Sequence, residues 1–592
     1  MATEQRVGGF GTVSRLKGAL FEAVSFGASV IGILALAVLL VYVSVDAFSL
    51  SEADPVWLLT YFLTLVVPYV GFCLYSVGER TFTLRVLQAL GGGLLVVATV
   101  FTAFELLVRP VPRLNWQLAY LFVVAVPVTA YVTVVGSRSR VGTVGFGLIG
   151  RMLGGIALGC WLFALFAVFD PQLWFLLYTL SLLPTVGLLA ADRLEFATPV
   201  ENAGPLVAGP VGVAGVAAAF LLRDVITVYP TTVILYTWSI VVPLSLVAAT
   251  LAARRSDWRT GTGIGALVFG VSVVAGFGAP QIGLTEEITL LVVLAVAVPT
   301  ISFVHRNLRN REGVVGLALP VLLVAGVVVG TLAVEAIGVS APKSWVNVSF
   351  LTNPPSIRNP SESGLYPAII GSIIVISFVA VLSLILGVGT AVFLEEYTAE
   401  SGLTGTITRI VQINIANLAA VPSVVYGLLG LGLFANLLGF GFGTVVTAGL
   451  TLSLLILPIT VISAQEAIRS VPDDLRQGSY AMGATRWQTT KNVVLPEAVP
   501  GILTGVILAL GRAIGETAPL IMIGAATTVY NPPNGVWSKI SAMPMQIFEW
   551  SSSAQQVFRT TILAAGVVTL LLVLIAMNAT AILIRNRYER GA

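Results

Sequence analysis

Long apolar runs are the feature that most constrains what this chain can fold into. Runs of about 20 residues with few or no charges recur along the whole sequence, and a helix needs about 20 apolar residues to cross a bilayer. Only 10% of the 592 residues are charged, whereas a soluble domain carries roughly 25%. The chain cannot cover a water-facing surface, so we expect an all-α integral membrane protein.

We count about sixteen candidate membrane-spanning helices. The first is longer than the apolar core of a signal peptide, about 7–15 residues, and no small-residue cleavage site follows it, so we expect it to persist as a helix. The candidate spans lie near 26–48, 56–76, 86–108, 116–136, 144–169, 172–191, 204–222, 231–253, 261–279, 286–304, 313–338, 366–394, 410–437, 441–464, 499–528 and 560–584.

The basic residues of the first ten spans predict the orientation of the chain, because cytoplasmic segments carry an excess of Lys and Arg. With the N-terminus inside, fourteen basic residues lie on the cytoplasmic side and three outside. The three are Arg109, Arg113 and Arg223; the fourteen are Arg6, Arg15, Lys17, Arg80, Arg85, Arg138, Arg140, Arg193, Arg254, Arg255, Arg259, Arg306, Arg309 and Arg311. We predict cytoplasmic termini, since Arg585, Arg587 and Arg590 also fall inside.

The basic loop at 305–312 divides the chain into two predicted modules. Residues 1–305 would form about ten spans and residues 306–592 another six. The two halves do not read as copies, and no internal repeat is evident. The role of the first module stays open between sensing, lipid contact and partner recruitment.

A polar loop at 465–498 separates the fourteenth and fifteenth spans. Ser470 and Asp473 predict a capping box that opens a short helix. Gly483 predicts the end of that helix, and a second short helix would follow as far as Pro496. Apolar residues among the polar ones make the loop an amphipathic knuckle: Leu475, Met482 and Trp487.

The end of this loop resembles a motif of ABC importer permeases. Gly483, nine residues, Val493, one residue and Leu495-Pro496 resemble the Gly-x9-Ile-x-Leu-Pro ending of their "EAA" loop, although Gln477-Gly478-Ser479 stands where the letters "EAA" would be. The resemblance implies that the loop docks on a separate ATPase subunit. The residues implied in this coupling are Leu475, Gly478, Ser479, Met482, Gly483, Leu495 and Pro496.

The last six spans resemble the PstA family of phosphate-importer permeases. The stretches that carry the resemblance start at Gly501, Trp345, Phe393 and Ile413, and read GILTGVILALGRAIGETAP, WVNVSFLTNPP, FLEEY and INIANLAAVPSVVYG. The resemblance implies a six-helix type I ABC permease fold and phosphate import. It also implies a sister permease of PstC type, an ATPase dimer of PstB type and an external phosphate-binding protein of PstS type.

One charged pair lies in the fifteenth span. Arg512 and Glu516 are four residues apart and share a helix face, and charges inside a span usually line a polar path and pair with each other. We expect Arg512 to attract an entering oxyanion, Glu516 to hold the guanidinium, and Thr517 to lie on the same path. Residues expected to pack or kink the helix as a gate are Gly511, Gly515 and Pro519.

Two other functions are compatible with parts of the same sequence. Sulfate and molybdate permeases resemble the Arg-x-x-Gly-Glu of the fifteenth span, so another oxyanion is an alternative, as is a membrane sensor or scaffold without transport. No phosphate-binding glycine-rich loop ending in Lys-Ser/Thr is present, so ATP would be hydrolysed by another protein and this chain is not expected to be an enzyme. Two cysteines and one histidine predict no metal site, and we expect no cofactor.

All these motifs lie beyond residue 310. We therefore expect the first ten spans to be a separate accessory module. On this interpretation, transport would survive in a chain that begins near Val304.

Overall fold

The computed structural model describes residues 15–168, 171–193, 204–253, 257–282, 285–311, 313–398 and 402–589, and Arg6, Arg254, Arg255 and Arg590 lie outside these ranges. Within them the regular elements are helices, as expected for an all-α protein. The α-helices of the N-terminal half are α1 (Arg15–Ala47), α2 (Pro55–Tyr61), α3 (Val67–Val77), α4 (Arg80–Leu107), α5 (Arg113–Tyr120), α6 (Val126–Gly136), α7 (Arg140–Val168), α8 (Pro171–Leu177), α9 (Leu183–Arg193), α10 (Gly204–Arg223), α11 (Thr232–Tyr236), α12 (Val242–Ala253), α13 (Trp258–Gly278) and α14 (Glu286–Asn310).

The C-terminal half continues the series after the short 3-10 helix η7 (Val314–Ala318). Its α-helices are α15 (Leu319–Ile337), α16 (Val348–Thr352), α17 (Tyr366–Ser383), α18 (Gly389–Val392), α19 (Gly402–Ala419), α20 (Ser423–Gly430), α21 (Val445–Arg469), α22 (Asp473–Ala481), α23 (Arg486–Thr489), α24 (Leu495–Ile514), α25 (Ala518–Met522), α26 (Met543–Ser551) and α27 (Leu563–Glu589).

The expected spans all fall on helices, and three of them differ from the prediction. Of the described helices, 14 are long and apolar enough to cross a membrane, and the seventh expected span is the shorter helix Val207–Arg223. The thirteenth is not one straight helix, because Gly405–Ala419 and Ser423–Leu437 meet at 105°. The fifteenth runs over Arg486–Ile514 instead of 499–528.

Four spans of the N-terminal half, the second, fourth, sixth and eighth, share an unusual helix. Each contains a five-residue π-helical segment that starts at or just after a tyrosine and ends two residues before a proline: η2 (Phe62–Val66), η3 (Leu121–Ala125), η4 (Tyr178–Leu182) and η5 (Thr237–Val241). The tyrosines, Tyr61, Tyr120, Tyr178 and Tyr236, are 59, 58 and 58 residues apart. The first eight spans are therefore a tandem repeat of a two-span unit, and the expectation of no internal repeat is wrong.

The prolines favour a wider turn at these four segments. Pro68, Pro127, Pro184 and Pro243 follow the four segments. A proline inside a helix cannot donate to the carbonyl four residues earlier, and its ring collides with that carbonyl. A π turn widens the helix locally, which separates the two groups without breaking the span. In lipid no water can satisfy a freed carbonyl, so neighbouring helices have to cover it.

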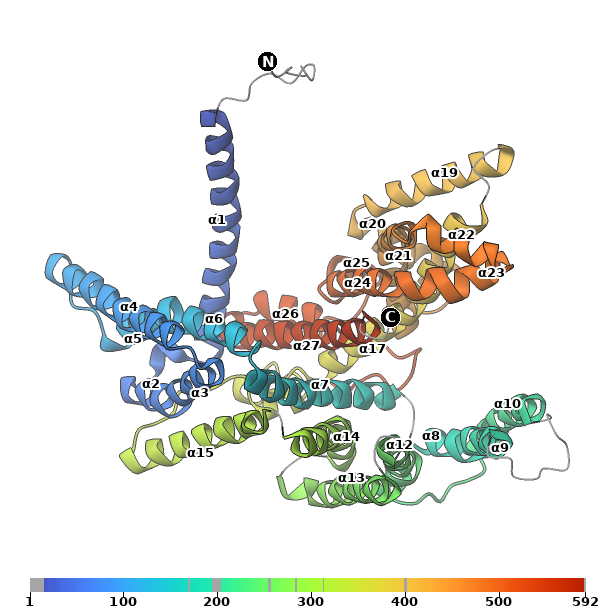
Figure 1. Cartoon of the computed structure of the whole chain (residues 1–592), viewed down its shortest axis with the longest axis horizontal. Coiled ribbons are helices and arrows are strands. Elements are labelled where there is room, and N and C mark those ends of the chain that lie inside the picture. Colours follow the sequence, from blue (N-terminus) through green and yellow to red (C-terminus); the bar gives the residue numbers. More distant parts are fainter. Residues whose placement is uncertain are drawn as a thin grey trace, which may run out of the picture.

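Helix α7 joins the two halves of the chain. Ala164 of α7 is fully buried in the same hydrophobic core as residues of α17, α21 and α24. The Trp161 indole Nε1 donates to the Ser377 hydroxyl of α17 at 2.7 Å, and α7 also packs on α27. Figure 1 shows α7 between α14 on one side and α27 on the other. The two predicted modules are therefore in contact through α7, and their division at 305/306 stays a prediction.

Arg151 of α7, which the charge count left out, lies inside the fifth span. Its guanidinium stacks over the Phe303 ring at 3.8 Å from the centroid, and Nη1 donates to the Gly147 carbonyl at 2.6 Å. A cation over an aromatic face is stabilised by the ring quadrupole. The α7–α14 interface therefore accommodates a charge at a depth where charges are costly.

A chain that begins near Val304 would cut α14 and lack α7. We expect a shorter chain that begins at Gly313 to reach at least tenfold lower abundance in the membrane than the full chain, because the core around Ala164 is left incomplete and loosely packed. Immunodetection of membrane fractions measures this, and co-expression of residues 1–311 as a second polypeptide should restore it. Full abundance of the short chain would support the separate module that the sequence suggested.

Candidate functional site

The loop between α21 and α24 forms a helical knuckle, α22 to α23 (473–489), as expected, but its capping differs from the prediction. Ser470 is the C-cap of α21, and its hydroxyl donates to the Ala467 carbonyl at 2.8 Å, so it caps no following helix. Pro472 stands at the N-cap of α22. The capping box lies at Thr485 and Gln488, where it opens α23. The reason is that α21 extends past 464 and takes Ser470 into its own last turn.

Gly483 makes the turn between the two helices of the knuckle. Its φ is +84°, and a Cβ added there would meet no atom within 4 Å. The left-handed conformation is therefore the only local obstacle to a side chain at this position. This confirms the expectation that Gly483 ends the first helix.

The second helix of the knuckle does not end at Pro496. It continues through the π segment η12 (Thr490–Val494) into α24, so that Arg486–Ile514 is one helix of 29 residues, called here the coupling rod. Pro496 is two residues beyond the π segment, as in the N-terminal repeats. A helix of 29 residues is about 43 Å long, which joins the knuckle directly to the charged pair in the span.

The knuckle presents apolar side chains to the outside. Met482 is 84% exposed, and Leu475, Tyr480 and Trp487 are also exposed. Ser479 is instead buried, and its hydroxyl lies 2.9 Å from the Thr489 hydroxyl across the turn. Of the other residues implied in coupling, Gly478 and Pro496 are exposed and Leu495 packs partly on the neighbouring core. Fewer of the residues implied in coupling are therefore exposed and available for docking than the sequence suggested.

Two carboxylates that sequence reasoning assigned no role fasten the knuckle to the membrane helices. They belong to η10 (Phe393–Tyr397), which ends the span that starts with α17. Glu395 accepts from Arg469 Nε and Nη2, both at 2.8 Å, and from Gln465 Nε2 at 2.7 Å. The only sequence signal was an adjacent acidic pair at the end of a long apolar run.

The second carboxylate, Glu396, is buried and pairs with Arg476 of the knuckle helix α22. Arg476 also donates to the Ile468 carbonyl at 2.8 Å, and the hydroxyl of Thr490 in η12 lies 3.5 Å from Glu396. One carboxylate thus touches α22 and the coupling rod. Charge-assisted hydrogen bonds of this kind are roughly twice as strong as neutral ones.

Arg512 and Glu516 form the expected pair, with Nε and Oε1 3.3 Å apart. The helix ends between them, because α24 stops at Ile514 and Gly515 is its C-cap. The side chains are 50% exposed for Arg512 and 17% for Glu516. Glu516 therefore contacts the guanidinium on one side and leaves half of the Arg512 side chain exposed, and Thr517 follows as the N-cap residue of α25.

Glycine spacing gives close helix contact at one end of α24 only. Cβ atoms on Gly501 and Gly505 would collide with Ala467 and Ser463 of α21. Gly511 has only an ordinary contact with Asn578, and Gly515 meets no other helix within 4 Å. Close packing is thus observed at Gly501 and Gly505, in the turns that follow Pro496. The packing expected at Gly511 and Gly515 is not seen within the described chain.

The bent thirteenth span packs on α25, the short helix that follows the charged pair. The Tyr426 hydroxyl donates to the Leu418 carbonyl at 2.8 Å across the bend. A Cβ on Gly427 would lie 2.8 Å from Pro519 Cα and 2.6 Å from Met522 Cβ, so α20 and α25 touch. Two stretches far apart in sequence are thereby brought together beside Glu516. The break in the helix that Pro519 predicts falls at 515–517, just before α25.

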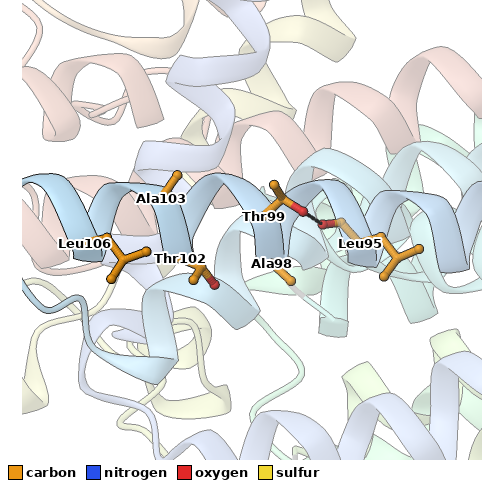
Figure 2. A pocket seen from close by; sticks show the side chains of 6 residues that line it. All are labelled: Leu95, Ala98, Thr99, Thr102, Ala103 and Leu106. Carbon is orange, nitrogen blue, oxygen red and sulfur yellow. Dashed lines mark hydrogen bonds between the residues drawn. The ribbon is translucent and has the colours of Figure 1, made fainter.

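A hollow of about 420 Å³ lies elsewhere, on α4 of the N-terminal half. Figure 2 shows its lining, which comes from a single helix: Leu95, Ala98, Thr99, Thr102, Ala103 and Leu106. The Thr99 hydroxyl donates to the Leu95 carbonyl at 2.8 Å. Without a charged group or a second wall, this shallow face offers an oxyanion no binding site.

Residues 397–587 match the family described as binding-protein-dependent transport system inner membrane component. The probable ABC transporter permease protein YqgI of Bacillus subtilis is 33% identical over 225 residues, 38% of this chain and 73% of that protein. The phosphate transport system permease protein PstA 1 of Mycobacterium tuberculosis is 34% identical over 223 residues, 38% of this chain and 70% of that protein. An inward-facing structure of the MetNI methionine ABC transporter covers 38% of this chain and 97% of that chain at 17% identity, with a TM-score of 0.31.

The knuckle turn can be tested at Gly483. Gly483→Val forces a β-branched residue into the left-handed region, which costs about 1 kcal/mol or more locally, and should separate ATP hydrolysis from uptake without lowering membrane abundance. Gly478→Ala is the matched control, because Gly478 is helical and also has no atom within 4 Å of a Cβ. Uptake per ATP hydrolysed in proteoliposomes measures the effect, and a normal ratio in Gly483→Val would refute the role of the turn.

Proposed function

Because the chain belongs to the family of binding-protein-dependent transport system inner membrane components, we propose that it carries inorganic phosphate across the cell membrane as a permease subunit of an ABC importer. The phosphate assignment is supported by relatives named as phosphate transport permeases and by the chemistry beside Arg512. Sulfate or molybdate is the competing substrate class.

One observation carries this proposal. The coupling rod Arg486–Ile514 is a single helix, with the knuckle turn at one end and the Arg512–Glu516 pair at the other. A helix transmits an axial or rocking displacement over its whole length, so a movement imposed at the knuckle reaches the pair. The pair is then displaced when the knuckle is displaced, as alternating access requires.

The side chains around the pair suit an oxyanion. A guanidinium offers several donors in a rigid fork that matches phosphate oxygens. Glu516 accepts through one contact of 3.3 Å, which compensates the charge of Arg512 while half of its side chain stays exposed. Thr517 adds a hydroxyl next to the carboxylate. We assign these three residues to the substrate path.

The knuckle is proposed to contact the ATPase. Leu475 and Met482 are exposed between the fourteenth and fifteenth spans, and Trp487 is exposed in the first turn of the coupling rod. A family of importer permeases implies partner subunits that hydrolyse ATP and bind substrate. We propose an ATPase dimer of PstB type at the knuckle, a sister permease of PstC type across the pore and an external phosphate-binding protein of PstS type. With the knuckle cytoplasmic, both termini are cytoplasmic as well.

Transport through Arg512 can be tested in the assembled complex. We expect Arg512→Ala to lower phosphate uptake at least tenfold, because the anion loses its cation and Glu516 is left unpaired. Glu516→Ala should also lower uptake, and the double variant should be no worse than Arg512→Ala alone, since the two act as a unit. Arg358→Ala, an exposed loop arginine, is the control. Near-normal uptake in Arg512→Ala, or stronger inhibition by sulfate than by arsenate, would count against phosphate transport.

The Glu396–Arg476 pair is proposed to position the knuckle. In Glu396→Gln, which keeps the side-chain shape, we expect ATP hydrolysis to continue and uptake per ATP to fall about tenfold. Glu466→Gln is the control, because this exposed carboxylate lies 3.6 Å from Arg469 and fastens no knuckle helix. The double variant Glu396→Gln/Arg476→Gln removes the buried charge as well as the link. If the double variant recovered normal uptake per ATP, only the unpaired charge of Arg476 would have been harmful. The Glu396–Arg476 contact would then have no role in coupling ATP hydrolysis to uptake.

A further inference from the structure

Helix α15 opens the permease half in sequence but packs on the N-terminal half. Its principal neighbours are α2, η2, α3 and α7, and Figure 1 shows it below α2 and α3, away from α19 to α25. Its buried residues form one stripe at helical spacing: Leu319, Gly326, Gly330 and Val334. Val328 and Val329, on the other side, are about half exposed. The stripe is therefore the contact face of α15, and it faces the repeat units.

The contact is made at the first π segment. A Cβ on Gly326 would lie 2.6 Å from the Thr64 carbonyl oxygen, and one on Gly330 would lie 2.8 Å from the Tyr61 ring and 2.9 Å from the Thr64 hydroxyl. Thr64 is four residues before Pro68, so its carbonyl is the one that the proline cannot satisfy. A glycine Cα can approach such an oxygen closely enough for a C–H···O contact.

A glycine also lies close to a π segment within the repeat units themselves. In the sixth span the carbonyl four residues before Pro184 belongs to Leu180, and a Cβ on Gly215 of α10 would collide with it. In the fourth span Gly93 of α4 packs equally closely on Val124 of η3. Each of these π segments is therefore covered by a glycine of a neighbouring span. At the first π segment, that span is α15.

Helix α1, the first span, does not cover the first π segment. Over most of its described length α1 is exposed; its buried end, Val43 and Ala47, packs with Ala564 of α27. Helix α1 thus contacts the permease half, while α15 covers the first repeat unit (Figure 1).

We propose that the second and fifth spans, on which α15 packs, form an intramembrane cradle whose bound partner is α15. In this arrangement α15 belongs mechanically to the repeat units and stays with them, while α17 to α27 carry out transport. The role assigned to the N-terminal half is to hold the permease in place through this helix and through α7. The proposal goes beyond the transport function and does not depend on which anion is carried.

Disulfide trapping in the full chain tests the contact. In a background with Cys73→Ala and Cys160→Ser, the pair Thr64→Cys/Gly330→Cys should cross-link almost completely on mild oxidation, because the two side chains meet within the Cβ separation of a disulfide, about 3.5–4.5 Å. The control pair Thr64→Cys/Val328→Cys should give less than a tenth of that yield. Adding Gly326→Leu to the first pair should lower its yield at least tenfold; if this variant does not accumulate, Gly326→Ala should lower the rate several-fold. Equal yields in the two pairs, or a yield that Gly326 variants leave unchanged, would overturn the contact.

A second measurement tests the mechanical assignment. If α15 stays with the repeat units, the oxidised Thr64→Cys/Gly330→Cys complex should retain the uptake of its reduced form within about twofold. Loss of uptake on oxidation, restored by reduction, would show that α15 moves against the cradle and would overturn the assignment. A complex that does not transport phosphate even when reduced and unmodified would contradict the proposed function instead, while the cross-linking result would still stand.

Discussion

The structure depends on one constraint, that a backbone carbonyl inside lipid needs a neighbour when its helical donor is lost. Prolines remove that donor inside several described helices, among them the four spans of the N-terminal half that carry a π segment and the start of α24. At these five prolines a π segment ends two residues before the proline, whereas no such segment precedes Pro210, Pro299, Pro458 or Pro500 in this way. Spans that would otherwise break at these prolines remain continuous, and glycines of adjacent helices can approach the widened turns.

This constraint connects the two ends of the permease. Because Pro496 is accommodated by η12, the knuckle and the Arg512 span form one helix and not two. The same device at Pro68 creates the surface on which α15 packs. Repetition in the N-terminal half and continuity in the C-terminal half thus have a common physical origin.

Ion pairs join the membrane helices to the knuckle. Within the described residues, Glu395 and Glu396 face Arg469 and Arg476 at the point where η10, α21 and α22 converge. Each carboxylate has several donors, so the three elements form a rigid unit. The Arg512–Glu516 pair is looser, with one contact and a half-exposed cation. A firm junction at the knuckle and a half-exposed cation at the other end of the rod suit the coupling proposed above.

Much of this protein follows from its sequence alone. Apolar run length determines that the chain spans a membrane, since lipid tolerates only satisfied backbone, and the local signals at Gly483 and at Arg512–Glu516 depend on residues at most four apart. Only the tertiary structure decided three features: the Glu396–Arg476 pair, the joining of the halves by α7, and the packing of α15 on the N-terminal half and of α1 on the permease half. Each joins residues from different helices, and apolar spans of similar length and composition do not specify which neighbour they contact; that depends on where a glycine of one helix fits a proline-widened turn of another.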